Sequence, residues 1–161
     1  MIANVLLSLE QHSEAVAEAE KALAVSPNDA NVLALGAYVL SPTGRANEAY
    51  VLMQRAFRLD PFPPPWYYGA LGDSLLFSNQ VERAIPAHKQ CTELTPDFIW
   101  CRLGLSADYA LLEMKEEARM QAKEALRINP KITAADNTYV RSIEPAQREH
   151  IITALRRADL K

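Results

Sequence analysis

The spacing of four prolines constrains the fold of this chain more than any other feature. They follow one another at intervals of 34, 35 and 34 residues, at Pro27, Pro61, Pro96 and Pro130. An alanine lies twelve residues before each of them, at Ala15, Ala49, Ala84 and Ala118. A second small residue lies five residues before, at Ala22, Ala56, Cys91 and Ala125. A period of this length, with small residues in phase, predicts a stack of similar units and not a single globular core.

Each unit has the pattern of a helix pair. The stretch that ends at each proline has apolar and charged residues at the spacing of an amphipathic helix, and the proline stops that helix beyond its last turn. A second apolar stretch precedes three of these helices, so the expected pairs are 32–40 with 46–59, 66–77 with 80–94, and 98–112 with 115–128. The small residues allow the two helices of a pair to approach closely. Pro86 falls inside 80–94, where it removes an N–H, so we expect a kink or a local distortion there.

The composition suits a soluble helical protein and narrows the possible partners. Of 161 residues, 49% are hydrophobic and 23% are charged, with five glycines. The net charge is −3 and no cluster of Lys and Arg occurs, which argues against nucleic acid as a partner, because phosphate contacts need such clusters. The first residues form a brief apolar run without a basic leader, so we expect neither a signal peptide nor a membrane span. These features predict a cytoplasmic protein.

The two cysteines, Cys91 and Cys101, form no CxxC pair and follow no recurrent spacing. Cys91 stands where the other units have alanine, so we interpret it as a small packed residue. A reducing compartment is the simplest context for such a pair.

The chain carries no pattern of residues that indicates catalysis. Its histidines, His12, His88 and His150, lie in different units without a cysteine or carboxylate at metal-ligand spacing, so we expect surface or packing roles. No glycine-rich phosphate loop, GxSxG or HExxH motif occurs. Carboxylate pairs such as Glu116 with Glu117, and Asp60 with Asp73, are expected in solvated positions. The sequence therefore predicts no catalytic residue, no cofactor and no metal site, and the chain is not expected to be an enzyme.

The repeated unit resembles the tetratricopeptide repeat. The best copy combines Leu71-Gly72 with Ala84, Cys91 and Pro96, and Leu35-Gly36 begins another. A third copy has Leu105 followed by Ser106 in place of the glycine, with Tyr109, Ala118, Ala125 and Pro130. Residues 100–104, Trp-Cys-Arg-Leu-Gly, also match the family's Trp-x-x-Leu-Gly two residues out of register, and we keep the register that the prolines set. The resemblance implies an all-α fold, a right-handed superhelical solenoid of helix-turn-helix repeats with a C-terminal capping helix.

The expected array is a single domain over residues 1–161. It consists of a truncated repeat, three full repeats and a degenerate end, at 1–27, 28–61, 62–96, 97–130 and 131–161. Residues 132–143 are a candidate fifth first helix, and Glu144-Pro145 begins a capping helix. The first helix is cut short at Met1 and no N-terminal cap is visible, so we expect a fragment or an array whose first helix is partly unprotected.

The resemblance also implies a binding surface, because the first helices of such arrays line a concave face that holds a peptide or a partner helix. The residues expected there are Trp66, Asp73, Leu76, Phe77, Trp100, Leu103, Ala107 and Leu111. Trp66 and Trp100 occupy equivalent places in adjacent repeats, either as aromatic anchors for a ligand or as packing between repeats, and we favour packing. Family members that bind acidic chaperone tails use Lys, Arg and Asn on these helices. Here Gly69, Asp73, Leu103 and Ala107 stand instead, which favours an apolar or mildly basic segment.

Two functions remain open. Residues 64–73, 84–89 and 98–103 are similar to the tetratricopeptide tails of bacterial class III adenylate/guanylate cyclases. The favoured function is a non-catalytic protein–protein interaction scaffold, a module of a larger bacterial signalling protein. The alternative is a self-association or intramolecular regulatory domain of a class III nucleotide cyclase, with a homodimer as one form.

Overall fold

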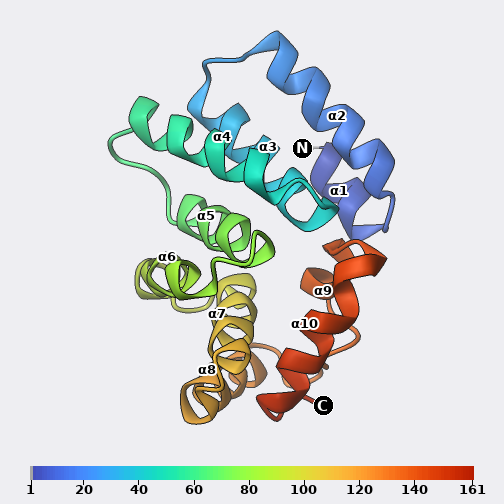
Figure 1. Cartoon of the computed structure of the whole chain (residues 1–161), viewed down its shortest axis with the longest axis vertical. Helices are drawn as coiled ribbons and strands as arrows, with labels where there is room; N and C mark the ends of the chain where they lie inside the picture. Colours follow the sequence, from blue (N-terminus) through green and yellow to red (C-terminus); the bar gives the residue numbers. More distant parts are fainter. Residues whose placement is uncertain (1) are drawn as a thin grey trace.

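The computed structural model describes residues 2–161, so the expected truncation at Met1 lies outside the described residues. Over this range the chain is helical and contains no strand. The helices are α1 (Ile2–Ser8), α2 (His12–Val25), α3 (Ala30–Leu40), α4 (Ala46–Leu59), α5 (Trp66–Phe77), α6 (Val81–Leu94), α7 (Ile99–Leu111), α8 (Lys115–Ile128), α9 (Thr138–Ser142) and α10 (Pro145–Arg157), with a short 3-10 turn η1 (Ser41–Thr43) after α3. The first eight α-helices form four successive antiparallel pairs that follow an arc (Figure 1). The predicted all-α repeat array is therefore confirmed, and the expected bounds of the paired helices hold to within two residues.

The turn inside each pair repeats as regularly as the prolines do. One residue in each turn has a positive φ: Glu10, Gly44, Asn79 and Glu113, with φ between 59° and 85°. The following N–H then bonds the carbonyl five residues back, as in the 2.9 Å bond from Gln80 N to Leu75 O. This is the Schellman arrangement, which satisfies the last carbonyls of the first helix and turns the chain into the second.

The small residues that identify the period lie where the helices of a pair touch. Those twelve residues before each proline have no exposed surface: Ala15, Ala49, Ala84 and Ala118. The residues five before are equally buried at Ala56, Cys91 and Ala125, whereas Ala22 is exposed. Ala22 differs because α1 is half as long as α2, with seven residues against 14, and does not reach it.

The expected fifth first helix over 132–143 is wrong. The chain after α8 is irregular as far as Asn137, and only the five residues of α9 are helical. The Asn137 side chain accepts a bond of 2.8 Å from Val140 N, so it caps α9 instead of lying within a longer helix. The second expected helix is confirmed, since α10 begins at Pro145.

The C-terminal segment, defined here as residues 131–161, runs back along the inner side of the arc (Figure 1). The expected capping helix is present: α10 packs along α7, and Asp159 pairs with Arg119 of α8 at 2.7 Å. The other end of the segment reaches the first repeats. Glu144 N donates to Pro42 O at 2.8 Å, and Arg148 pairs with Glu10 at 2.8 Å. The segment therefore connects the last repeat to the first across the face that α1, α3, α5 and α7 line.

Candidate functional site

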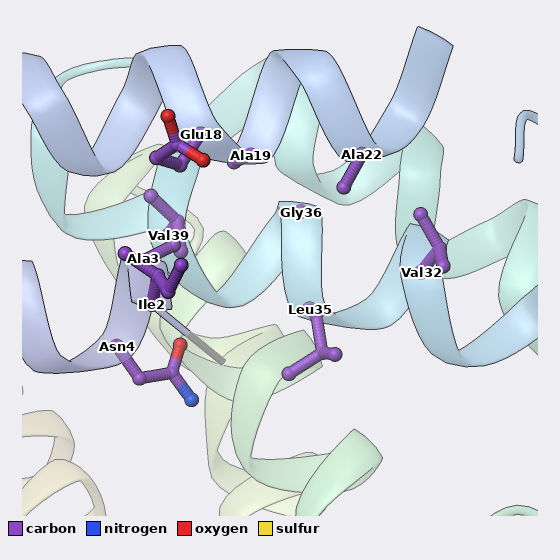
Figure 2. A pocket seen from close by; sticks show the side chains of 10 residues that line it. All are labelled: Ile2, Ala3, Asn4, Glu18, Ala19, Ala22, Val32, Leu35, Gly36 and Val39. Atoms are coloured by element: carbon purple, nitrogen blue, oxygen red, sulfur yellow. The ribbon is translucent and has the colours of Figure 1, made fainter. Parts of the chain in front are cut away.

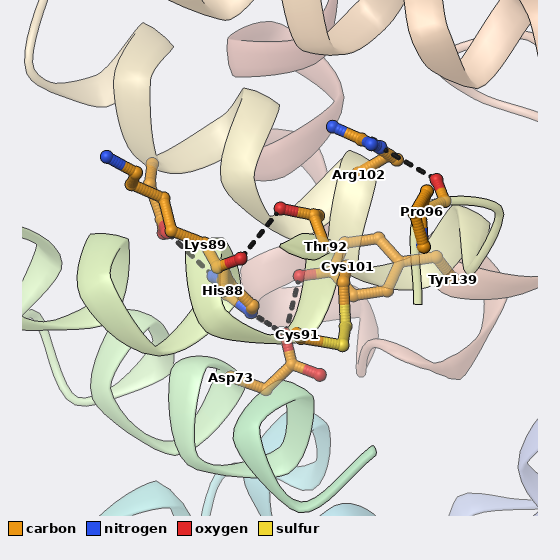
Figure 3. Close-up of a disulfide and its surroundings, with 10 residues drawn as sticks. Asp73, His88, Lys89, Cys91, Thr92, Pro96, Cys101, Arg102 and Tyr139 are labelled. Carbon is orange, nitrogen blue, oxygen red and sulfur yellow. Dashed lines mark hydrogen bonds and ion pairs between the residues drawn. A yellow bond between two sulfur atoms is a disulfide. The ribbon is translucent and has the colours of Figure 1, made fainter. Parts of the chain in front are cut away.

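A histidine between two carboxylates lies at the centre of the array. His88 of α6 is 1% exposed. Its Nδ1 lies 2.7 Å from Oδ2 of Asp108 on α7, and its Nε2 lies 3.3 Å from Oδ1 of Asp73 on α5. The hydroxyl of Tyr139, on α9, donates to the same Asp73 oxygen at 2.9 Å (Figure 3). We call these four residues the His88 cluster; it joins two repeats to the C-terminal segment.

Two glycines make room for the imidazole. A Cβ atom at Gly72 would lie 2.5 Å from His88 Nε2, and one at Gly104 would lie 2.6 Å from the same atom. Gly104 thus makes room for the histidine of the preceding repeat. This accounts for the glycine in the Trp-x-x-Leu-Gly match at residues 100–104, which lies two residues out of register. Ser106 faces its own second helix, where its Oγ donates to Ala118 O at 3.0 Å. These contacts agree with the register that the prolines set.

The cluster carries charge although it is buried. Burial alone lowers the pKa of His88, but the charge and hydrogen bond of Asp108, with those of Asp73, outweigh it and raise the pKa to about 10. Burial raises the pKa of Asp108 to about 6, against the opposing effect of His88. At neutral pH the imidazolium therefore donates from both ring nitrogens. Oδ1 of Asp108 is buried and has no hydrogen-bond partner among the described residues.

A disulfide lies one helical turn from this histidine. Cys91 of α6 is bonded to Cys101 of α7, with their Cα atoms 6.2 Å apart and both side chains buried (Figure 3). A Cβ atom at Gly69 would lie 2.7 Å from Cys101 Sγ, so this glycine gives the bridge its space. The prediction of a small packed residue is right for the burial of Cys91. The bridge itself was not predicted; it forms because the turn after Pro96 brings α6 and α7 together at these two positions, ten residues apart in the sequence.

The residues expected on the concave face lie on the first helices, and several of them meet the C-terminal segment: Asp73 and Trp100 contact Tyr139, and Leu76, Phe77 and Leu111 lie beside α10. Half of them are buried: Asp73, Leu76, Leu103 and Ala107. The others are half-buried: Trp66, Phe77, Trp100 and Leu111. The Trp100 ring stacks on Tyr38 at 5.1 Å between centroids and meets Tyr139 edge-on at 5.5 Å. Trp66 packs against Tyr67 at 4.6 Å. Both tryptophans are thus engaged in packing within the chain.

The sequence-based interpretation missed most of the His88 cluster. Asp73 was expected in a solvated position, which is wrong because α5, α6 and α7 meet there and bury it. His88 was expected in a surface or packing role and is buried, but its contacts with two carboxylates were not predicted. Asp108 and Tyr139 were not singled out. Asp108 carried a signal, since it is the one charged residue in the otherwise apolar and small run 103–112. Nothing local marks Tyr139, because its partner is 66 positions away.

A hollow lies between α1, α2 and α3, away from the His88 cluster, and has a volume of about 170 Å³ (Figure 2). Its walls are mostly apolar, with Asn4 as a polar and Glu18 as the one charged lining residue. Helix α1 lies along only the first half of α2, so Ala22 in the second half of α2 and Gly36 of α3 line the hollow. No set of convergent polar groups surrounds it. Across residues 2–161 no group of histidine, cysteine and acidic side chains is arranged to hold a metal ion, and no helix has the length and apolarity to span a membrane.

Comparison with known proteins identifies the repeat and the fold. A family model of the tetratricopeptide repeat matches residues 1–29 and 67–98. A comparison with curated proteins finds no match. Among solved structures, TTC0263, a thermophilic TPR protein in Thermus thermophilus, superposes with a TM-score of 0.69 at 19% identity, covering 98% of this chain and 86% of that chain. MamA superposes with a TM-score of 0.64 at 18% identity, covering 98% and 92%. YrrB, described as a TPR protein with an unusual peptide-binding site, superposes with a TM-score of 0.60 at 22% identity, covering 99% and 82%.

Proposed function

We propose that this chain, a member of the tetratricopeptide-repeat family, is a non-catalytic scaffold that holds a segment of a partner protein on its concave face. Proteins of this fold are protein-interaction scaffolds, and the YrrB structure is described as having a peptide-binding site. The partner competes with the C-terminal segment of the chain itself. Binding therefore requires that residues 131–161 leave the inner side of the arc.

The observation that carries this proposal is the way in which the concave face holds the C-terminal segment. Tyr139 places its hydroxyl on Asp73 and its ring against Trp100. The next residue, Val140, and Ile143 are fully buried. The face thus accepts a tyrosine followed by aliphatic residues, held by aromatic contact and by one charge-assisted hydrogen bond.

A peptide of the chain's own sequence 136–148 is the probe that tests this. The full-length Tyr139→Ala variant loses the contacts to Asp73 and Trp100, so its segment is released more easily. We expect a labelled 136–148 peptide to bind this variant in a fluorescence-anisotropy titration more tightly than it binds the unaltered chain. A Phe62→Ala variant, altered at an exposed aromatic side chain between α4 and α5 that lines neither the concave face nor a groove, serves as the matched control and should behave like the unaltered chain. Equal weak binding to all three proteins would contradict the proposal.

The same observation favours a second candidate function, in which the C-terminal segment acts within or between copies of the chain. A segment that closes the arc in one chain can make the same contacts in a second copy, which produces a dimer without a new interface. Light scattering of the unaltered chain over a hundredfold range of concentration distinguishes the closed monomer from the dimer. A mass that doubles with concentration supports the dimer, and a constant monomer mass opposes it. That this chain belongs to a nucleotide cyclase remains a proposal. The coding sequence upstream of residue 1 in the gene tests it directly.

The compartment is a further question that the disulfide raises. The sequence favours the cytoplasm, whereas thiols that meet in space stay reduced there and form bridges in oxidising compartments. Alkylation of intact cells followed by mass analysis of Cys91 and Cys101 decides between these two locations. Free thiols support the cytoplasm, and a bridge opposes it.

A further inference from the structure

A groove on the outer side of the array has walls from α4 and α6 and a floor from α5. It lies away from the C-terminal segment and has a volume of about 760 Å³, within the usual range of ligand sites. Aromatic and apolar side chains make up seven of its twelve lining residues: Tyr50, Phe57, Tyr68, Leu71, Leu75, Pro86 and Ala87. We call it the outer groove. The partner proposed for the concave face does not use it.

Hydrogen bonds between side chains hold Arg83 and the Tyr50 hydroxyl, both hydrogen-bond donors, in place at the outer groove. Arg83 reaches from α6 to α4, where its Nη2 donates to the Tyr50 hydroxyl oxygen at 2.6 Å, and its guanidinium carbon lies 5.1 Å from the Tyr50 ring centroid. Its Nη1 donates to the side-chain oxygen of Gln80, which holds the guanidinium in place. Gln54 Nε2 donates to the Tyr50 oxygen at 2.9 Å. Because this oxygen accepts two bonds, the hydroxyl proton of Tyr50 is left to donate to another acceptor.

The charges of the outer groove lack a counterpart. Arg58 and Arg83 line it, and among residues 2–161 neither forms an ion pair with a carboxylate. Glu82 is the one acidic residue in the lining. The groove thus has two guanidinium groups and a free phenolic O–H but only one carboxylate, so its charge is complementary to that of an added anion. A carboxylate is the best match among anions, because a guanidinium can donate two parallel hydrogen bonds to it.

Pro86 adds an acceptor to the α6 wall of the groove. Helix α6 continues from Val81 to Leu94 through this proline. Proline has no N–H, so the carbonyl of Glu82 lacks the donor that an ordinary residue would supply four positions later. Both Glu82 and Pro86 line the groove. The carbonyl without its helical donor therefore belongs to a residue of the groove wall.

We infer that the outer groove binds a short extended segment of a partner protein in which an acidic side chain adjoins an aromatic or aliphatic one. The carboxylate is held by Arg83 and the Tyr50 hydroxyl, the apolar side chain lies on the floor of α5, and a backbone N–H donates to the Glu82 carbonyl. The lining runs over residues 50–58 of α4 and 82–90 of α6. At 1.5 Å per residue this is about 12 Å, which accommodates three or four extended residues.

The test uses the full-length protein and a blocked peptide, acetyl-Leu-Asp-Phe-Leu-amide, followed by amide chemical shifts in solution. We expect shifts confined to α4, α5 and α6 around the groove, with saturable binding. The Asn counterpart of the peptide should bind about tenfold more weakly, the loss that one charge-assisted hydrogen bond implies. Arg83→Gln and Tyr50→Phe should each weaken binding, and Glu82→Gln should strengthen it.

Lys89→Gln is the matched control, since Lys89 is an exposed cation on the same helix that does not line the groove. It should leave binding unchanged. The inference is overturned if Lys89→Gln and Arg83→Gln weaken binding equally, which would show attraction by net charge alone. It is also overturned if the peptide does not bind, or if the shifts fall on Trp100 and Tyr139. That last result would place the peptide on the concave face and leave the proposed function standing.

Discussion

The hydroxyl of Tyr139 donates to the carboxylate of Asp73 at 2.9 Å although 66 positions separate the two residues. This bond connects the C-terminal segment to the middle of the array. It lies in a buried environment, where a hydrogen bond to a charged group contributes more than it does at the surface. Removing it therefore tests whether the segment is held as the structure shows.

Tyr139→Phe removes this hydrogen bond and retains the ring. We expect a loss of about 1.5–3 kcal/mol in the free energy of unfolding, because a buried carboxylate loses one of its donors. Urea denaturation followed by circular dichroism measures it. Tyr109→Phe is the control, since the Tyr109 hydroxyl makes no hydrogen bond to the residues that the structure describes, and it should change stability by less than about 0.5 kcal/mol. Equal effects of the two variants would contradict the assignment.

His88→Ala leaves Asp73 and Asp108 buried without the cation between them. We expect a loss of about 3–5 kcal/mol, the cost of breaking a buried ion pair from one side. Adding Asp108→Asn to this variant should restore part of the loss, because one uncompensated charge is then removed. A double variant less stable than His88→Ala alone would be inconsistent with this account. Guanidinium denaturation of the full chain measures both.

The His88 cluster should make stability fall as the pH rises. The pKa of His88 is raised from 6.5 to about 10, so the stabilisation that it contributes is fully present below pH 6.5 and is lost as the pH rises through about 10. The pKa of Asp108 is raised from 3.8 to about 6, so between these values stability also falls as the pH rises. Unfolding free energies measured from pH 7 to pH 10 should decrease more steeply for the unaltered chain than for His88→Gln, which cannot titrate. Parallel curves would show that other groups cause the decrease.

Gly72→Ala and Gly104→Ala introduce a methyl group against the buried ring of His88. The Cβ atoms would lie 2.5 Å and 2.6 Å from Nε2, and the ring is fixed by its two carboxylates, so we expect losses of about 1–3 kcal/mol each. Gly36→Ala is the comparison, because its Cβ would lie 2.9 Å from the end of the Leu23 side chain, which is flexible and not held by hydrogen bonds. Thermal unfolding should show a clearly smaller change for Gly36→Ala. If Gly36→Ala instead lowered stability more than Gly72→Ala and Gly104→Ala, the imidazole of His88 would have to move more easily than the Leu23 side chain, which would contradict a ring fixed by its two carboxylates.

The sequence predicted the helix pairs well because their signals are local. The proline period and the alanines at Ala49, Ala84 and Ala118 report contacts between helices that follow each other in the chain, and these alanines are fully buried. The expected helix over 132–143 failed for a local reason as well, since Asn137 prefers to cap a helix. The eight residues expected on the concave face lie on α5 and α7, and their role in binding stays a prediction. No pattern in the sequence indicated that the C-terminal segment covers this face.

By itself, then, the sequence determined a repeat of helix pairs, its register and its resemblance to the tetratricopeptide repeat. Each of these depends on residues within about one period of one another, where a simple pattern of small, apolar and breaking residues is enough. Only the tertiary structure decided that His88 pairs with Asp73 and Asp108, that Cys91 meets Cys101, and that Tyr139 returns to the array. Those contacts depend on how neighbouring repeats and the C-terminal segment are placed in space, and no spacing along the chain encodes that placement.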